Sequence, residues 1–332
     1  MKRHNQILAA VLVVQIVLSV VVFWPKSQAS AESEPVFPDL EAGDIVALTI
    51  TDADDNRVTL RQAAGDWVLP DADDYPAQAD KITPLREKIV GLTTGRLVTR
   101  TDASHKRLQV HPGDFVRRID FETADGTEQT VYLGSSPRYG TIHFRVDGQS
   151  EVYLTSDITT YEANATAGSW VDITYLNVIQ DDVTGMTLEN GNGTFTFTRE
   201  SAAGAGAAGA ADGTWTMEEL AADETLDEAR VSTLLRQATL VNIISPLGKA
   251  DQPAYGMDEP SAVVTLRTGD KTVTLRVGAK DPDDNSYVVI SSESPYYVRV
   301  AEYSAKDLVE NTRDDLLKVE PTPTPEGDAD ES

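Results

Sequence analysis

Short segments in which apolar and polar residues alternate follow one another from residue 44 onward. Segments 44–50 and 57–62 alternate, segment 65–69 is short and mostly apolar, and the acidic stretch 52–56 separates the first two. Alternation with a period of two places every second side chain on one face of a strand, and Asp and Asn favour turns. The pattern predicts an antiparallel β-meander.

The next segment, residues 78–92, changes to helical spacing. Its apolar positions lie three or four residues apart, which predicts an amphipathic helix with Asp80 as its N-cap. A short helical stretch is also expected near residues 155–165, at the end of this unit. The apolar positions of the first helix are Ile82, Leu85, Ile89 and Leu92.

Between these two helices the alternation predicts two β-hairpins. Asp125–Gly126 and Asp147–Gly148 lie at their centres. Such pairs supply the positive φ angles that tight hairpin turns need. The predicted strands are 115–123 and 129–134 in the first hairpin, and 141–146 and 150–155 in the second.

The second half of the chain repeats this order. Trp215 follows Trp67, and Pro260 follows Pro112, by 148 residues in both cases, while Gly278 follows Gly134, and Tyr297 follows Tyr153, by 144 residues. An offset that changes once, in a turn, indicates duplication followed by a change of loop length. We therefore predict an α+β fold with two homologous modules, 43–176 and 177–319. Each is an antiparallel sheet flanked by one or two helices.

An alanine- and glycine-rich run, residues 201–213, has the composition of a flexible linker. It lies between the segments "TFTFTRE" and "TWTM", and the first module has only "AA" at the same place. We interpret the run as a flexible, expanded hairpin loop inside the second module.

The N-terminus predicts a transmembrane anchor at residues 7–24, an apolar run preceded by Lys2 and Arg3. Residues 1–6 are then cytoplasmic, residues 25–42 form a stalk, and the rest of the chain lies outside the cell membrane. A cleaved signal peptide ending near Ala29 is the alternative. The C-terminal residues 320–332 have the composition of a disordered acidic tail.

Acidic residues outnumber basic ones by 54 to 28, which gives a formal net charge of −26. This balance argues against nucleic acids and anionic lipids as partners, because both require neutralised phosphates. The sequence contains no cysteine, so disulfides and thiolate metal sites are excluded.

A set of strand and turn residues in both modules matches a known family. They are Gly213, Trp215, Tyr255, Gly256, Pro260, Leu275, Gly278, Tyr287, Tyr296 and Tyr297 in the second module, and Gly65, Trp67, Pro112 and Gly134 in the first. With these residues the chain resembles the DUF4340 family, a domain of unknown function, although the first module has "LQVH" where the second has "AYGM". Members of this family are often encoded beside components of gliding-type ABC transporters. The resemblance therefore implies an accessory role at a membrane transport complex.

Catalytic chemistry is not indicated by any motif. The four histidines, at positions 4, 105, 111 and 143, show no zinc-binding spacing. We therefore expect no catalytic residues, no bound cofactor and no enzymatic activity.

Two acidic turns are the most site-like features. Oxygen-bearing side chains lie at alternate positions of both turns, as they do in calcium-binding loops. They are Asp52, Asp54 and Asn56 in the first turn, and Asp281, Asp283 and Asn285 in the second. Both turns lack the glycine and the final glutamate of such loops, so hairpin turns are the main interpretation and weak calcium sites the alternative.

These observations favour a non-catalytic, membrane-anchored scaffold or accessory subunit that works with an ABC-type transporter or another envelope complex. The alternative is an extracytoplasmic binding module for a glycan, a peptide or a divalent cation. Such a module would use the acidic turns and the tyrosines that cluster near the later hairpins of both modules.

Overall fold

The computed structural model describes residues 15, 33–200, 213–218, 220–269 and 271–318. Apart from Gln15, the predicted anchor lies outside the described residues, as do residues 201–212 of the alanine- and glycine-rich run and the predicted acidic tail. Within the described ranges, no helix combines the length and the apolar character that a membrane crossing requires.

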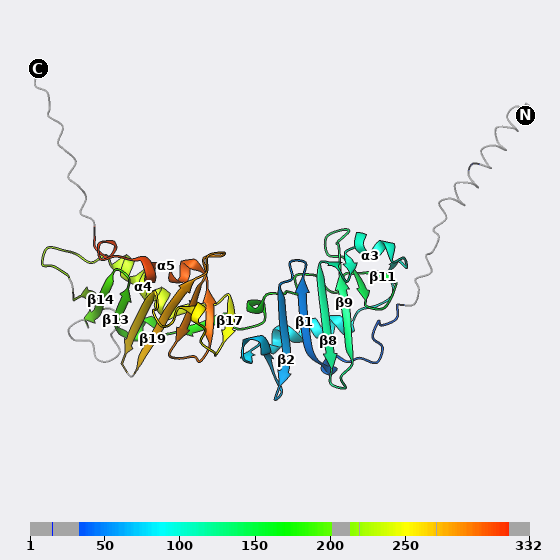
Figure 1. The fold of residues 1–332 in the computed structure, drawn as a ribbon, viewed down its shortest axis with the longest axis horizontal. Coiled ribbons are helices and arrows are strands. Elements are labelled where there is room, and N and C mark those ends of the chain that lie inside the picture. The colour runs from blue at the N-terminus through cyan, green and yellow to red at the C-terminus, as the bar shows by residue number, and fades with distance from the viewer. Residues whose placement is uncertain (1–14, 16–32, 201–212, 219, 270, 319–332) are drawn as a thin grey trace, which may run out of the picture. The chain divides into compact units, whose positions relative to one another are not determined.

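The first large sheet has nine strands and contains the predicted meander (Figure 1). Strands β1 and β2 pair antiparallel, with Thr49 opposite Thr59, and β2 pairs with β3 in the same way. The order of strands is β4-β3-β2-β1-β8-β9-β10-β11-β5. Their bounds are β1 Ile45–Asp52, β2 Arg57–Ala63, β3 Asp66–Leu69, β4 Tyr75–Pro76, β5 Leu97–Thr99, β8 Arg117–Thr123, β9 Glu128–Leu133, β10 Ile142–Val146 and β11 Val152–Thr155.

The predicted helix of the first module is α2, Ala79–Val90. Its apolar positions are buried as the spacing predicts, since Ile82, Leu85, Ile89 and Leu92 are at most 2% exposed. The expected N-cap was wrong: the helix already begins at Ala79, so Asp80 lies in its first turn. A carboxylate there still complements the positive end of the helix dipole.

No helix forms at residues 155–165, where a short helical stretch was expected. Turns occupy this segment, and the Glu162 carboxylate accepts hydrogen bonds from the backbone amide and the hydroxyl of Thr159. The Lys88 ammonium pairs with the same carboxylate at 2.5 Å, so a residue of α2 holds the loop in place. A short 3₁₀ helix follows at Ala167–Ser169.

The second large sheet has eight strands, in the order β15-β14-β13-β18-β19-β20-β21-β17. Each of its strands corresponds in order to a strand of the first sheet: β15 to β3, β14 to β2, β13 to β1, β18 to β8, β19 to β9, β20 to β10, β21 to β11 and β17 to β5. The first sheet has β4 as an additional edge strand. Two meanders meet at a central antiparallel pair in both cases, and a strand that follows the helix closes the far edge. The bounds are β13 Val183–Asn190, β14 Gly193–Glu200, β15 Thr214–Met217, β17 Ser245–Gly248, β18 Ala262–Thr268, β19 Thr272–Lys280, β20 Tyr287–Ser291 and β21 Tyr297–Val300.

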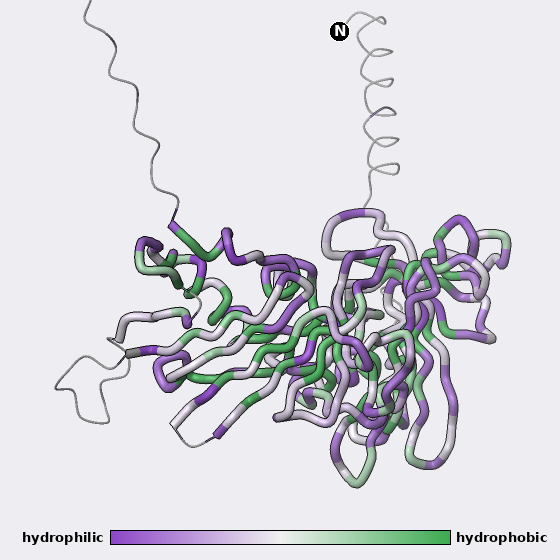
Figure 2. Tube along the Cα trace, turned by 60° about the vertical axis from the view of Figure 1, so that its left-hand side comes forward, coloured by the Kyte–Doolittle hydropathy of each residue, from purple (hydrophilic) through white to green (hydrophobic). Residues whose placement is uncertain are grey.

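Two helices pack on one face of the second sheet, α4 (Glu228–Thr239) and α5 (Glu302–Glu310) (Figures 1 and 2). The Asp227 carboxylate caps α4 by accepting from the amides of Ala229 and Arg230. Helix α5 contacts α4, β13 and β18 through its buried face. Hydrophobic residues follow the strands of this sheet, whereas many hydrophilic residues lie at the turns (Figure 2).

The alanine- and glycine-rich run connects two paired strands. Strands β14 and β15 are antiparallel, with Arg199 opposite Trp215 on either side of it. In the first sheet, Ala64 and Gly65, both with positive φ, make the same connection between β2 and β3. The run is therefore the connection of a hairpin.

The two predicted Asp–Gly turns join β8 to β9 and β10 to β11. Gly126 and Gly148 have φ angles of 84° and 75°, as expected, but the preceding aspartates do not have positive φ. Two further short ribbons complete the fold. They pair β6 (Val110–His111) with β7 (Asp114–Phe115), and β12 (Thr174–Asn177) with β16 (Leu240–Asn242).

Candidate functional site

Four of the residues that carry the family resemblance, Tyr255, Gly256, Gly278 and Tyr297, lie at a tight turn packed against β19, β20 and β21. The turn consists of the 3₁₀ helix Pro253–Tyr255, Gly256 and Met257, and we name it the signature turn. Gly256 adopts a φ of 67°, which glycine tolerates without strain. Tyr255, Met257 and Val288 form a buried cluster, against which Leu247, Ile290 and Tyr297 pack while partly exposed.

Gly278 on β19 allows this turn to approach the sheet. A Cβ atom at this position would lie 2.0 Å from the carbonyl oxygen of Tyr255, far inside the van der Waals limit. The glycine of the repeated "TLRVG" segment therefore has a steric explanation: backbone of the signature turn occupies the place of a side chain.

Aromatic and basic side chains surround the signature turn. The rings of Tyr255 and Tyr297 have centroids 5.3 Å apart, and burial raises the pKa of both hydroxyls. Both phenols are therefore neutral at physiological pH. The Arg276 guanidinium donates to the carbonyl oxygen of Met257 and anchors the end of the turn to β19.

The first sheet builds the same arrangement from different side chains. Leu108, Gln109 and Val110 form its turn, and Gln109 has a φ of 55° where the second copy has Gly256. A Cβ on Gly134 would lie 2.1 Å from the carbonyl oxygen of Leu108. The departure "LQVH" thus preserves the backbone of the signature turn, although Gln109 adopts a conformation that costs a side-chain-bearing residue energy.

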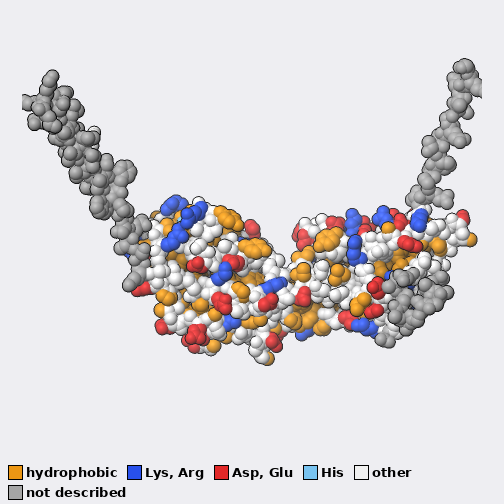
Figure 3. All heavy atoms as spheres, turned by 180° about the vertical axis from the view of Figure 1, so that it is seen from behind, with side chains coloured by type: hydrophobic (Ala, Val, Ile, Leu, Met, Phe, Trp, Pro, Cys, Tyr) orange, Lys and Arg blue, Asp and Glu red, His pale blue; other side chains and the backbone are white. Residues whose placement is uncertain are grey.

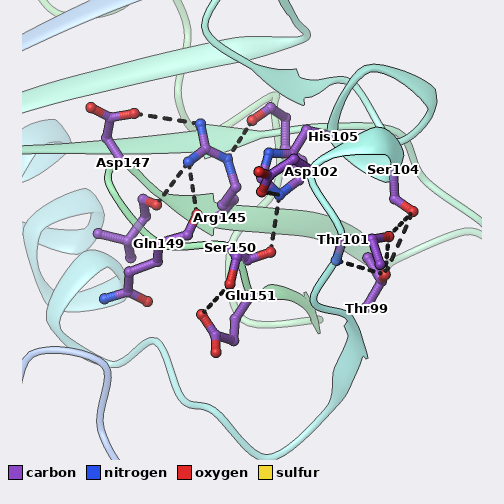
Figure 4. A network of polar contacts seen from close by, with 12 residues as sticks. Thr99, Thr101, Asp102, Ser104, His105, Arg145, Asp147, Gln149, Ser150 and Glu151 are labelled. Carbon is purple, nitrogen blue, oxygen red and sulfur yellow. Dashed lines mark hydrogen bonds and ion pairs between the residues drawn. The ribbon is translucent and has the colours of Figure 1, made fainter.

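A buried arginine fixes the turn of the first sheet (Figure 4). Arg145 on β10 is 4% exposed, and its Nε donates to the carbonyl oxygen of Val110 at 2.7 Å. Its Nη1 donates to the carbonyl oxygens of Val146 and Gln149, and its guanidinium lies 4.7 Å from the centre of the Tyr132 ring. Arg145 and Arg276 therefore each hold the end of the turn in their own sheet, but from non-equivalent strands, because β19 corresponds to β9 and not to β10.

The three histidines among the described residues all make structural contacts. His105 Nε2 is 2.9 Å from the carbonyl oxygen of Ser150, which joins α3 (Ala103–Arg107) to the turn before β11 (Figure 4). The Nδ1 atom of His111 accepts from the amide of Gly113. His143 Nδ1 lies 2.7 Å from the carbonyl oxygen of Ser135.

His143 and Ser135 superficially resemble a nucleophile and its base, since Nδ1 is also 3.2 Å from the Ser135 hydroxyl. The carbonyl oxygen only accepts, so Nδ1 carries the proton, and it has no lone pair to accept one from the serine. Burial lowers the pKa of His143, which favours the neutral form of the imidazole ring. This geometry does not activate Ser135 through Nδ1.

The first acidic turn uses its leading carboxylate to close the β1–β2 hairpin. Asp52 Oδ1 accepts from the backbone amides of Asp54 and Asn56, and its Oδ2 accepts from the Asn56 side chain at 3.0 Å. Asp55 has a φ of 64° at the centre of the turn. The side chains of Asp52 and Asn56 are therefore hydrogen-bonded to each other, as the side chains of a closed hairpin turn.

The second acidic turn joins β19 to β20 and is held by an arginine. Asp281 Oδ1 accepts from the amide of Asp283, and its Oδ2 pairs with Arg299 at 2.7 Å. Asn285 has a φ of 60°. Across the described ranges, no group of three or more His, Cys, Asp or Glu side chains has an arrangement that could hold a metal ion.

The aromatic residues near the later hairpins differ in exposure and lie on separate elements. Tyr132, Tyr153, Trp170 and Tyr287 are buried. Tyr139, Tyr161 and Tyr303 are exposed, and they lie on the β9–β10 loop, the loop after β11 and helix α5, respectively. Charged side chains of both signs are scattered over most of the face in Figure 3.

Sequence reasoning missed Arg145 and the role of Gln109. Arg145 occupies a polar position of the alternating segment "TIHFRV", opposite Tyr132 in the neighbouring strand, so its burial is not indicated by the pattern. Nothing in the residue type of Gln109 signals its positive φ. The equivalence of Gln109 with Gly256 becomes apparent only when Leu108 is aligned with Tyr255 in the structure.

Two copies of one antiparallel topology, each with a signature turn seated over a glycine, define a tandem-sheet protein. The family model of DUF4340, described as a domain of unknown function, matches residues 67–258 and 215–325. The chain therefore belongs to the DUF4340 family. No curated protein and no solved structure matches it.

Proposed function

We propose that this protein is a membrane-anchored, extracytoplasmic scaffold or accessory subunit with no catalysis of its own. It works with an ABC-type transporter or a similar envelope complex. The observation that carries this proposal is the repeated signature turn, because in both sheets its residues serve internal packing. Family membership and the apolar run at residues 7–24, which would anchor the chain with its bulk outside, support it further.

The test is affinity purification of the tagged full chain from gently solubilised membranes. We expect transporter subunits, an ATPase and a permease, to copurify with it. A fusion of residues 1–42 to an unrelated domain is the matched control, because it keeps the predicted anchor and stalk but lacks both sheets. Recovery of the chain alone, or equal recovery of the subunits with the control, would contradict the proposal.

An extracytoplasmic binding module remains the second function, and the exposed rings of Tyr139, Tyr161 and Tyr303 favour a glycan or peptide over a cation. A glycan array with the exported part of the chain, from residue 43 onward, tests it. The cation version has less support, because the Asp52 carboxylate already accepts hydrogen bonds within its turn and the Asp281 carboxylate already pairs with Arg299.

Calcium should therefore leave the protein unchanged. We expect the same melting temperature in millimolar calcium and in chelator. A clear rise with calcium that the double substitution of Asp52→Asn and Asp281→Asn abolishes would restore the cation-binding alternative.

A further inference from the structure

Two consecutive Asn–Gly pairs form the turn between β13 and β14. They are Asn190–Gly191 and Asn192–Gly193, and no other asparagine in the sequence precedes a glycine. A following glycine lacks a Cβ atom, so its backbone nitrogen can approach the side-chain carbon of the asparagine closely. Chemically, this is the pairing most prone to spontaneous loss of the side-chain amide.

In the folded protein both side chains cap the C-terminal end of α5. Asn190 Nδ2 donates to the carbonyl oxygens of Leu308 at 3.1 Å and Asn311 at 3.0 Å. Asn192 Nδ2 donates to the carbonyl oxygen of Glu310 at 2.8 Å. The last carbonyl groups of a helix have no intrahelical donor, so these amides satisfy groups that would otherwise lack a protein partner.

We propose that this Asn–Gly turn is a deamidation site that the docking of α5 protects, and that its modification releases the end of α5. The inference is independent of the proposed scaffold function. It rests on the hydrogen bonds between the turn and the helix.

The reaction needs no reagent other than water. The backbone nitrogen of Gly191 forms a bond to Cγ of Asn190, the Cγ–Nδ2 bond breaks, and ammonia leaves with the proton of the Gly191 amide. Water then opens the succinimide ring to aspartate or isoaspartate. The same steps apply to Asn192 and Gly193.

Docking slows this attack because it fixes the side chains. Asn190 Oδ1 accepts from the backbone amide of Asn192 at 2.8 Å, while both Nδ2 groups are held by α5. Each side chain must leave these partners before Cγ can meet the glycine nitrogen, so the reaction requires local opening. After conversion, a carboxylate, which has no hydrogen to donate, faces carbonyl oxygens at the negative end of the α5 dipole.

The first test follows deamidation of the full chain by peptide mass mapping, beside a synthetic peptide of residues 186–197. We expect both asparagines to react about tenfold more slowly in the protein than in the peptide. Leu308→Ala, which removes a buried side chain of α5, should accelerate the reaction. Leu60→Ala removes an equally buried leucine from β2 and should not.

Equal rates in the protein and the peptide would overturn the proposal, as would equal acceleration by Leu60→Ala. If Leu308→Ala does not fold, melting temperatures of Asn192→Asp and Asn192→Ser decide. Both variants lose the amide donor, but only aspartate adds a charge next to the helix end. The aspartate variant should melt at the lower temperature, and equal melting temperatures would refute the release of α5.

Discussion

Gly278 has no room for a side chain, because a Cβ atom would lie 2.0 Å from the Tyr255 carbonyl oxygen. We expect Gly278→Ala to lower the free energy of unfolding by about 2–3 kcal/mol, since backbone must move to relieve the overlap. Gly134→Ala should act similarly through Leu108. Chemical denaturation measures both, and Gly43→Ala is the control, because nothing lies within 4 Å of its added Cβ. A loss of unfolding free energy no larger than that of the control would show that the signature turn can move away from an added Cβ atom at little cost.

A second prediction at the residue scale concerns the ion pair between Glu224 and Arg313. Both of its carboxylate oxygens pair with Arg313, and this lowers the pKa of Glu224 from 4.5 to about 2. A pKa lower in the folded state means that the unfolded chain binds the proton more readily. The stabilisation is therefore complete above about pH 5 and disappears as the pH falls toward 2.

Glu224→Gln should accordingly lower the melting temperature near neutral pH, and the difference from the unmodified protein should shrink between pH 5 and pH 2. Thermal unfolding across this range measures the effect. Glu293→Gln, which affects an exposed pair with Lys271, is the matched control and should change little. A difference that does not depend on pH would contradict the role of the carboxylate charge.

At the scale of the elements, periodicity predicted the strands of the first meander, helix α2 and the two later hairpins. It failed at Asp80 because a helix begins at its first residue with helical backbone angles, which is Ala79 here. It failed again at residues 155–165, where Lys88 and Thr159 hold Glu162 in a turn. Lys88 comes from the distant helix α2, so the sequence around Glu162 does not indicate this contact.

The connection between β14 and β15 provides a prediction at the same scale. Shortening Ser201–Ala211 to two alanines should leave the fold intact, since the strand pairing that flanks the run lies outside the deletion. Shortening a loop reduces its closure entropy only slowly, so we expect a gain in stability of about 1 kcal/mol or less. Soluble yield and the melting temperature measure the outcome. A collapse of the soluble yield would mean that the run separates domains instead of closing a hairpin.

At the scale of the whole molecule, the repeat predicted from four pairs of residues appears as two sheets with the same strand order. The site was less accessible to sequence reasoning. Gly134 and Gly278 were visible as matched positions, but their partners are backbone carbonyl oxygens, which have no residue signature. Arg145 and Arg276 escaped comparison because they lie on non-equivalent strands of their sheets, β10 and β19.

The central functional claim is that the protein works as a subunit of a larger membrane complex. Native mass spectrometry of the full chain, purified in mild detergent from its own membranes, tests it most directly. We predict a species whose mass equals this chain plus an ATPase and a permease, and which dissociates into those subunits on activation. A species with the mass of the chain alone, or of its own multiples, would contradict the claim.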